Sequence, residues 1–127
     1  MILYHFTSRE NAALIVAQGR IAPQPWWYGD CPPVAWLTAT AQRAAYKGWE
    51  GASALEYTEV RFTVDLPPGD AFPWRTWAMG YGVSEDACDM AAAGSPARWY
   101  VCERPILRPE WAQVIWAGNR RPFAALD

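Results

Sequence analysis

The stretch that decides the fold is MILYHFTSRENAALIVAQGRIAP, residues 1–23. Its residues 2–6 are apolar and β-prone apart from one histidine, and they predict a strand. Thr7 and Glu10 are three positions apart and predict a capping box at the start of an apolar helix. Gly19 fits the left-handed position just after a helix, and the closing proline prevents a return to helical structure. The stretch therefore predicts a strand, a tight turn and a helix.

This arrangement delivers His5, the only histidine of the chain, near the carboxyl end of a strand and beside a helix start. A side chain in that position can face a cleft. The unpaired backbone N–H groups of the first helical turn would lie close enough to receive an anion. His5 is therefore the first candidate site residue.

A second motif follows, Val34-Ala-Trp-Leu-Thr-Ala-Thr40. It is β-prone, and it places Trp36 two positions before Thr38. Residues 41–49 are Ala-rich and predict a helix that carries Tyr46 and is capped by a threonine. The chain thus presents a histidine strand, then an aromatic-x-Thr strand, then a helix with a second aromatic residue.

These linked motifs, in this order and at this spacing, resemble the opening of the ADP-ribosyltransferase fold, in particular its diphtheria-toxin-like class with a His, Tyr, Glu signature. The resemblance covers residues 2–47, and the rest of the chain matches in outline. It implies a single α+β domain over residues 1–127. In that fold two small antiparallel sheets form a split β-sandwich with short helices.

The resemblance also implies a substrate, NAD, and a site for it. In the family the histidine contacts the adenosine ribose of NAD, and two aromatic residues sandwich the nicotinamide. Trp36 and Tyr46 stand at those two aromatic positions. The NAD-contacting residues that it implies are His5, Thr7, Trp36, Thr38, Tyr46 and Arg98.

The catalytic glutamate is where this chain departs from the family pattern. Aligning the β-prone residues 98–103 with the family's acid-bearing strand places Arg98 at the acid position, whereas Glu103 comes several residues later. Glu103 would reach the site if the strand began later or if a bulge shifted its register. A carboxylate there would stabilise the oxocarbenium-like state of nicotinamide–ribose cleavage, whereas an arginine suits a phosphate. The candidate catalytic residues are Glu103 and His5.

Three functions stay open. The first is an NAD-dependent mono-ADP-ribosyltransferase of effector, toxin or phage type, with an unknown acceptor. The second is a protein of the same scaffold that lacks catalysis and binds a nucleotide, or inhibits a partner protein through its Trp-rich loops at residues 22–33 and 67–83. The third is an RNA 2′-phosphotransferase-like activity, which needs several arginines around the histidine. Arg9, Arg20 and Arg98 are the candidates for that role.

Composition favours one folded domain of 127 residues and 14.3 kDa. A net charge of −2 offers no basic footprint for nucleic acid, and no apolar run reaches the length of a membrane span. The spacing of Cys31, Cys88 and Cys102 matches neither a zinc site nor a disulfide framework. We therefore expect a reduced, cytoplasmic protein. Its nine tryptophans must be divided between the core and a cleft or interface.

The rest of the chain predicts further elements. Residues 57–66 alternate between apolar and polar side chains and predict a strand with one wet face. Residues 71–83 show no clear period and predict an ordered loop, with room for a short helix. Ser84 predicts the start of a short helix. Residues 98–103 and 112–117 predict the last two strands.

Overall fold

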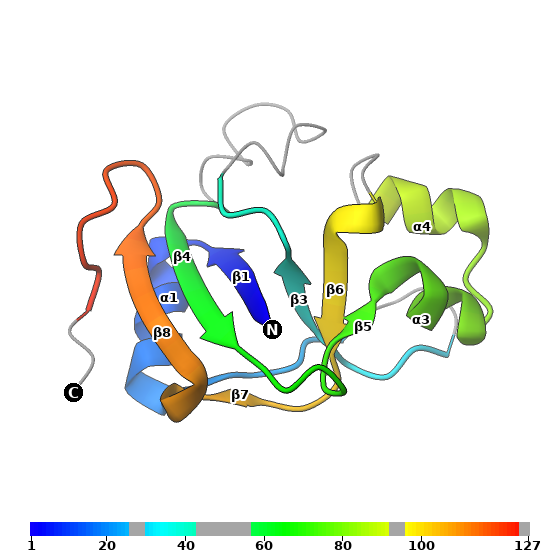
Figure 1. The fold of residues 1–127 in the computed structure, drawn as a ribbon, viewed down its shortest axis with the longest axis horizontal. Coiled ribbons are helices and arrows are strands. Elements are labelled where there is room, and N and C mark those ends of the chain that lie inside the picture. Colours follow the sequence, from blue (N-terminus) through cyan, green and yellow to red (C-terminus); the bar gives the residue numbers. More distant parts are fainter. Residues whose placement is uncertain (26–29, 43–56, 92–95, 125–127) are drawn as a thin grey trace.

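The computed structural model describes residues 1–25, 30–42, 57–91 and 96–124, which build an α+β fold on an antiparallel sheet (Figure 1). Six strands form this sheet in the order β5-β6-β3-β1-β4-β8. They are β1 (Ile2–Thr7), β3 (Ala35–Thr38), β4 (Val60–Asp65), β5 (Phe72–Pro73), β6 (Trp99–Cys102) and β8 (Trp111–Trp116). A second, two-stranded sheet pairs β2 (Arg20–Ile21) with β7 (Ile106–Leu107). The prediction of an α+β chain with two antiparallel sheets is confirmed at this level, and the two sheets are very unequal in size.

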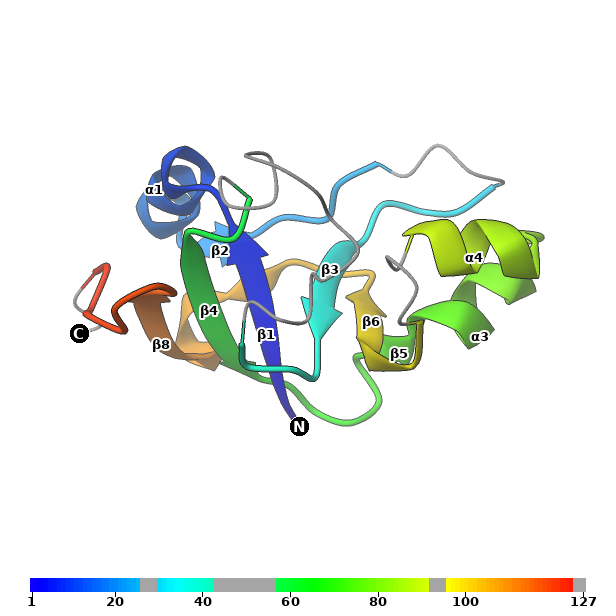
Figure 2. The same ribbon diagram turned by 90° about the horizontal axis from the view of Figure 1, so that it is seen from above.

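Within the described residues, three helices accompany the sheets. They are α1 (Arg9–Gln18), α3 (Trp74–Gly80) and α4 (Glu85–Ala91). Two short 3₁₀ turns, η2 (Pro96–Arg98) and η3 (Arg108–Glu110), precede β6 and β8. Seen from above, α1 lies near the β1–β4 part of the main sheet, whereas α3 and α4 lie beyond β6 (Figure 2).

The first strand and helix form as predicted, but the predicted capping box is wrong. Thr7 pairs with Val60 as the last residue of β1, and this pairing keeps its backbone extended. Ser8 is the N-cap instead, because its Oγ accepts the N–H of Asn11 at 3.2 Å. Gly19 ends the helix at φ 72°, in the left-handed conformation that the sequence predicts, and its N–H donates to the Ile15 carbonyl at 2.8 Å.

The buried side chains form two clusters on opposite faces of the main sheet. Successive strand residues point to opposite faces, and the neighbouring residues Leu37 and Trp36 of β3 belong to different clusters. The first cluster is mainly aliphatic and includes Ile15 of α1 and Ile21 of β2. The second is rich in tryptophan: Trp74, Trp77 and Trp99, with Trp36 packed against them.

Several boundaries differ from the predictions. Residues 74–80 of the predicted loop form α3, because Trp74, Trp77 and Ala78 are spaced to bury one helical face. Strand β6 begins at Trp99 rather than Arg98 and ends before Glu103. Strand β8 begins at Trp111, one residue earlier than predicted.

The helix predicted over residues 41–49 falls largely on residues that the structure does not describe. Ala41 and Gln42 are not helical, and the rest of it lies outside the described residues. The predicted helix after Ser84 is confirmed, and the Ser84 Oγ accepts the Ala87 N–H at 3.2 Å.

Candidate functional site

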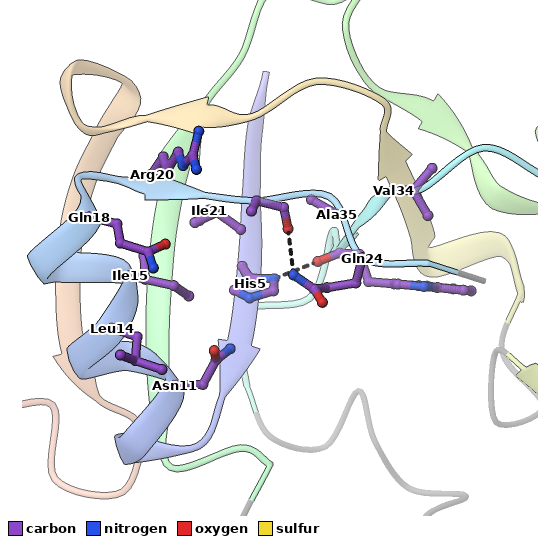
Figure 3. A pocket seen from close by; sticks show the side chains of 12 residues that line it. His5, Asn11, Leu14, Ile15, Gln18, Arg20, Ile21, Gln24, Val34 and Ala35 are labelled. Carbon is purple, nitrogen blue, oxygen red and sulfur yellow. Dashed lines mark hydrogen bonds between the residues drawn. The ribbon is translucent and has the colours of Figure 1, made fainter.

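A pocket of about 280 Å³ opens beside His5, between β1, the side of α1, and the chain that runs from β2 to β3 (Figure 3). Strand β1 supplies His5, and Gly19 turns the chain after α1 so that β2 returns across the helix. The pocket is lined by His5, Asn11, Leu14, Ile15, Gln18, Arg20, Ile21, Ala22, Gln24, Val34, Ala35 and Trp36.

His5 is half-buried, and its hydrogen bond to the main chain determines its tautomer. Its Nδ1 lies 2.8 Å from the carbonyl oxygen of Trp36. A carbonyl only accepts, so Nδ1 must carry the hydrogen, and Nε2 of the neutral ring is then an acceptor. Burial lowers the pKa of His5, and the bond to the Trp36 carbonyl only partly opposes that effect. His5 is therefore neutral at pH 7, with an acceptor nitrogen at the pocket.

The other polar groups of the pocket are amides and one cation. Asn11 donates from Nδ2 to the Thr7 Oγ1 at 2.7 Å, and this bond fixes the orientation of its side chain. Gln24 reaches the Ala22 carbonyl at 3.4 Å from Nε2. Arg20 forms an ion pair with none of the residues that the structure describes.

No carboxylate lines this pocket among the described residues. A neutral imidazole acceptor, several amides and one guanidinium suit a ligand that carries hydroxyl groups and a negative charge. The described lining thus contains no carboxylate that would stabilise a developing cation.

The pocket meets α1 along its side and not at its N-terminus. The first-turn N–H of Asn11 is occupied by the Ser8 Oγ, and the Ala12 N–H by the Ser8 carbonyl at 2.8 Å. Arg9 and Glu10, the first two residues of the helix, do not line the pocket, so the expected anion contact with the helix start stays a prediction. Asn11, Leu14, Ile15 and Gln18 present the side of the helix instead.

Trp36 meets His5 through its main chain. Its indole packs within the tryptophan cluster, with ring centroids 4.3 Å from Trp74 and 5.7 Å from Trp99. The ring of His5 contacts Phe62 of the aliphatic cluster on the other face, at 6.2 Å. His5, expected to contact the adenosine ribose, and Trp36, the first residue of the expected nicotinamide clamp, thus have their side chains on opposite faces of the sheet. The second clamp residue, Tyr46, lies outside the described residues.

The two threonines of the expected set have separate roles. Thr7 is buried and reaches the pocket only through its bond to Asn11. Thr38 is also buried, and its Oγ1 accepts the Thr40 N–H at 3.2 Å, which closes the turn after β3. Thr38 therefore stabilises the chain locally and does not line the pocket.

Arg98 and Glu103 flank the two ends of β6. Because Ala35 pairs with Cys102 and Thr38 with Trp99, Arg98 lies at the end of the sheet away from the pocket. Glu103 accepts hydrogen bonds from the Trp77 Nε1 at 2.6 Å and the Tyr81 hydroxyl at 3.4 Å. It lines a separate open pocket of about 340 Å³. The structure therefore separates both residues from His5.

Sequence reasoning missed Asn11, Gln18 and Gln24. The first two are seven residues apart on one face of α1, so helical periodicity could have placed them beside the histidine. Gln24 sits in the proline-rich chain after β2, where no period applies. Its position is held by mutual backbone hydrogen bonds with Val34, at 2.8 and 3.0 Å.

Comparison with known protein families, with curated sequences and with solved structures finds no match to this chain. None of the described helices is long and apolar enough to cross a bilayer. All three cysteines are free thiols, with Cys88 and Cys102 buried and Cys31 half-buried.

Proposed function

We propose that the chain binds NAD, or another nucleotide that contains ADP-ribose, in the His5 pocket. One observation carries the proposal. The bond from His5 Nδ1 to the Trp36 carbonyl directs an imidazole acceptor into a pocket that also holds Arg20 and no described carboxylate. This chemistry agrees with the role that the ADP-ribosyltransferase resemblance gives to His5, which is contact with a ribose.

The pocket chemistry suggests how such a ligand would sit. A ribose hydroxyl would donate to the Nε2 of His5, while the amides of Asn11 and Gln18 would bind the second hydroxyl. A phosphate would accept from the guanidinium of Arg20, whose planar fork matches an oxyanion. About 280 Å³ is less than most drug-sized ligands occupy, so the pocket would take one ribose-phosphate end and leave the rest of the dinucleotide outside it.

A second candidate is ADP-ribosyl transfer from NAD to an unknown acceptor, with Glu103 as the acid. The observation that favours it is the carboxylate held by both Trp77 and Tyr81. We rank it second because Glu103 does not line the His5 pocket. The RNA 2′-phosphotransferase alternative has only Arg20 of its three arginines at the pocket, since neither Arg9 nor Arg98 lines it.

The binding test uses the fact that His5 is the only histidine, so its ring gives a single assignable set of NMR signals. NAD should shift these signals in a saturable manner. His5→Ala and Arg20→Gln should each weaken binding about tenfold, which is the usual size of one hydrogen bond to a ligand phosphate or hydroxyl. Arg9→Gln is the matched control and should bind like the unmodified protein. NAD titration that leaves the His5 signals unmoved would contradict the proposal.

The transfer test follows nicotinamide release in the same samples. Release that Glu103→Gln abolishes would establish the second candidate. Binding without release would support a nucleotide-binding protein that performs no transfer.

A further inference from the structure

Arg61 of β4 holds a half-buried positive charge on the face of the sheet opposite His5. Its Nη1 donates to the Ala41 carbonyl at 2.9 Å, and its Nη2 donates to the Gln113 Oε1 at 3.0 Å. The Tyr4 ring lies 5.0 Å from its Cζ. Its Nε is buried without a hydrogen-bond partner. All of these neighbours are neutral, so among the described residues no carboxylate compensates the guanidinium.

The contact with Arg61 fixes how Gln113 is turned. A guanidinium only donates, so it must face the oxygen of the amide. The Nε2 of Gln113 then points away from Arg61 as a free pair of donors. Gln113 is exposed on β8, and it lines an open pocket on that side.

This second pocket, of about 370 Å³, lies between β8 and the chain that returns along it. Ile115 pairs with Pro122, and the Trp116 N–H donates to the Arg121 carbonyl at 2.9 Å. The Arg120 pocket, as we name it, is lined by Ala112, Gln113, Val114, Ile115, Arg120, Pro122 and Ala124. Its described lining holds two side chains that can donate hydrogen bonds, Gln113 and Arg120, and no carboxylate.

Arg120 is held in place by its backbone. It adopts φ 61°, and its N–H donates to the Trp116 carbonyl at 2.8 Å. Burial lowers the pKa of Arg61, and the positive charge of Arg120 contributes in the same direction. The two cations therefore repel each other, and an anion bound near them would relieve this repulsion.

We propose that the Arg120 pocket binds a phosphate group. The oxyanion accepts hydrogen bonds from the Nε2 of Gln113 and the guanidinium of Arg120, and Arg61 orients Gln113 from behind. Phosphate fits best because the arginine fork pairs with two of its oxygens at once. The site lies along the edge strand β8 and shares no lining residue with the His5 pocket, so it does not depend on the proposed NAD site.

The test is an NMR titration of the ¹⁵N-labelled protein with inorganic phosphate, at constant ionic strength set with sodium chloride. The side-chain NH₂ of Gln113 and the Nε of Arg120 should shift in a saturable manner. Gln113→Glu keeps an oxygen for Arg61 and removes both donors, so the fold should persist while phosphate affinity falls at least tenfold. Arg120→Asn should have the same effect, because asparagine tolerates a positive φ.

Arg121→Gln is the matched control, an exposed neighbour that does not line the pocket. His5→Ala, which should lose NAD, should keep its phosphate affinity, and this result separates the two sites. A parallel titration with AMP measures whether a nucleoside on the phosphate adds affinity. Shifts that sodium chloride alone reproduces, or equal affinity in Arg120→Asn and Arg121→Gln, would overturn the proposal. Circular dichroism identifies any variant that fails to fold. If Gln113→Glu does not fold, the phosphate affinity of Arg120→Asn alone decides the test.

Discussion

The two faces of the main sheet are covered by different kinds of side chain. On one face Leu37 packs with Ile15 of α1 and Ile21 of β2. On the other, Trp74 of α3 and Trp99 of β6 fill the space with large rings. The aliphatic face leaves the His5 pocket open at its margin, whereas Trp74 is completely buried. The comparison teaches that the described tryptophans serve mainly as packing, and that the pocket beside His5 lies where the side chains are smaller.

The difference between the faces predicts unequal costs of truncation. Trp74→Ala removes a fully buried ring, its contacts with Trp36 and Trp77, and the hydrogen bond from its Nε1 to the Cys88 carbonyl at 3.0 Å. We expect a loss of about 3–5 kcal/mol in the free energy of unfolding, measured by urea denaturation.

Leu37→Ala is the matched variant on the opposite face, because Leu37 is also fully buried. It should cost about 2–4 kcal/mol and leave the near-ultraviolet circular dichroism of the tryptophans nearly unchanged. Should Leu37→Ala prove more damaging than Trp74→Ala, the tryptophan cluster would be peripheral and the comparison would fail.

The ion pairs of the two regions should also differ in their contribution to stability, by smaller amounts than the buried side chains. Arg104 donates from its guanidinium to Asp70 at 2.6 Å and to Glu110 at 2.7 Å, and these bonds tie the chain before β7 to η3 and to the loop after β4. On the tryptophan side Arg75 of α3 forms a single, more exposed pair with Glu85 of α4. Arg104→Gln should cost about 1–2 kcal/mol, after allowance for solvent screening, and Arg75→Gln about 0–1 kcal/mol.

The Arg104 network should also make stability depend on acid. Hydrogen bonds from Arg104 lower the pKa of Glu110 from its ordinary value of 4.5. The unfolded chain then binds the proton first, so the stabilisation is complete above pH 4.5 and is lost as the pH falls through the folded pKa. Urea denaturation at decreasing pH should show this loss in the unmodified protein and not in Arg104→Gln. Parallel profiles would exclude the network as its cause.

Replacement of two glycines by alanine should change the stability of the fold in opposite directions. Gly19 follows α1 with φ 72°, so Gly19→Ala should destabilise the fold by about 1 kcal/mol even though no atom blocks the new methyl group. Gly80 ends α3 without a positive φ and with equally open surroundings. Gly80→Ala should stabilise by about 0.5 kcal/mol through helix propensity. Thermal denaturation of the two variants measures both changes in stability. Destabilisation by Gly80→Ala would show that α3 needs a glycine at this position.

Local sequence signals account for much of this fold. The strand–helix–glycine order of residues 2–19 could be predicted because each signal acts within one turn or one strand. The start of α1 was misplaced because Thr7 and Ser8 are both capping residues, and only pairing with Val60 decides between them. The bounds of helix α3 could not be predicted, because its apolar face consists of tryptophans among residues without a clear period.

The site was harder to predict than the fold. His5 lines a pocket as expected, but Trp36 could be assigned to the opposite face only once the register of three strands was known. Glu103 and Arg98 were expected at one site because the resemblance places the family's acid-bearing strand at residues 98–103. The pairing of β6 with β3 places them at its two ends. Such separation depends on contacts between distant segments, which local patterns do not encode.

The smallest expected effect is the pH dependence of stability that His5 contributes at the open margin of the aliphatic face. Burial lowers its pKa, so between its folded pKa and the ordinary value of about 6.5 only the unfolded chain binds the proton. Stability should therefore fall as the pH drops below about 6.5 and should be level above it. His5→Asn keeps a donor for the Trp36 carbonyl and does not titrate, so this part of the pH dependence should disappear. Urea denaturation between about pH 5 and 7.5 measures the difference. A variant that keeps the same slope would mean that the imidazole binds protons alike in the folded and the unfolded chain, and His5 would then not be the desolvated group that we infer.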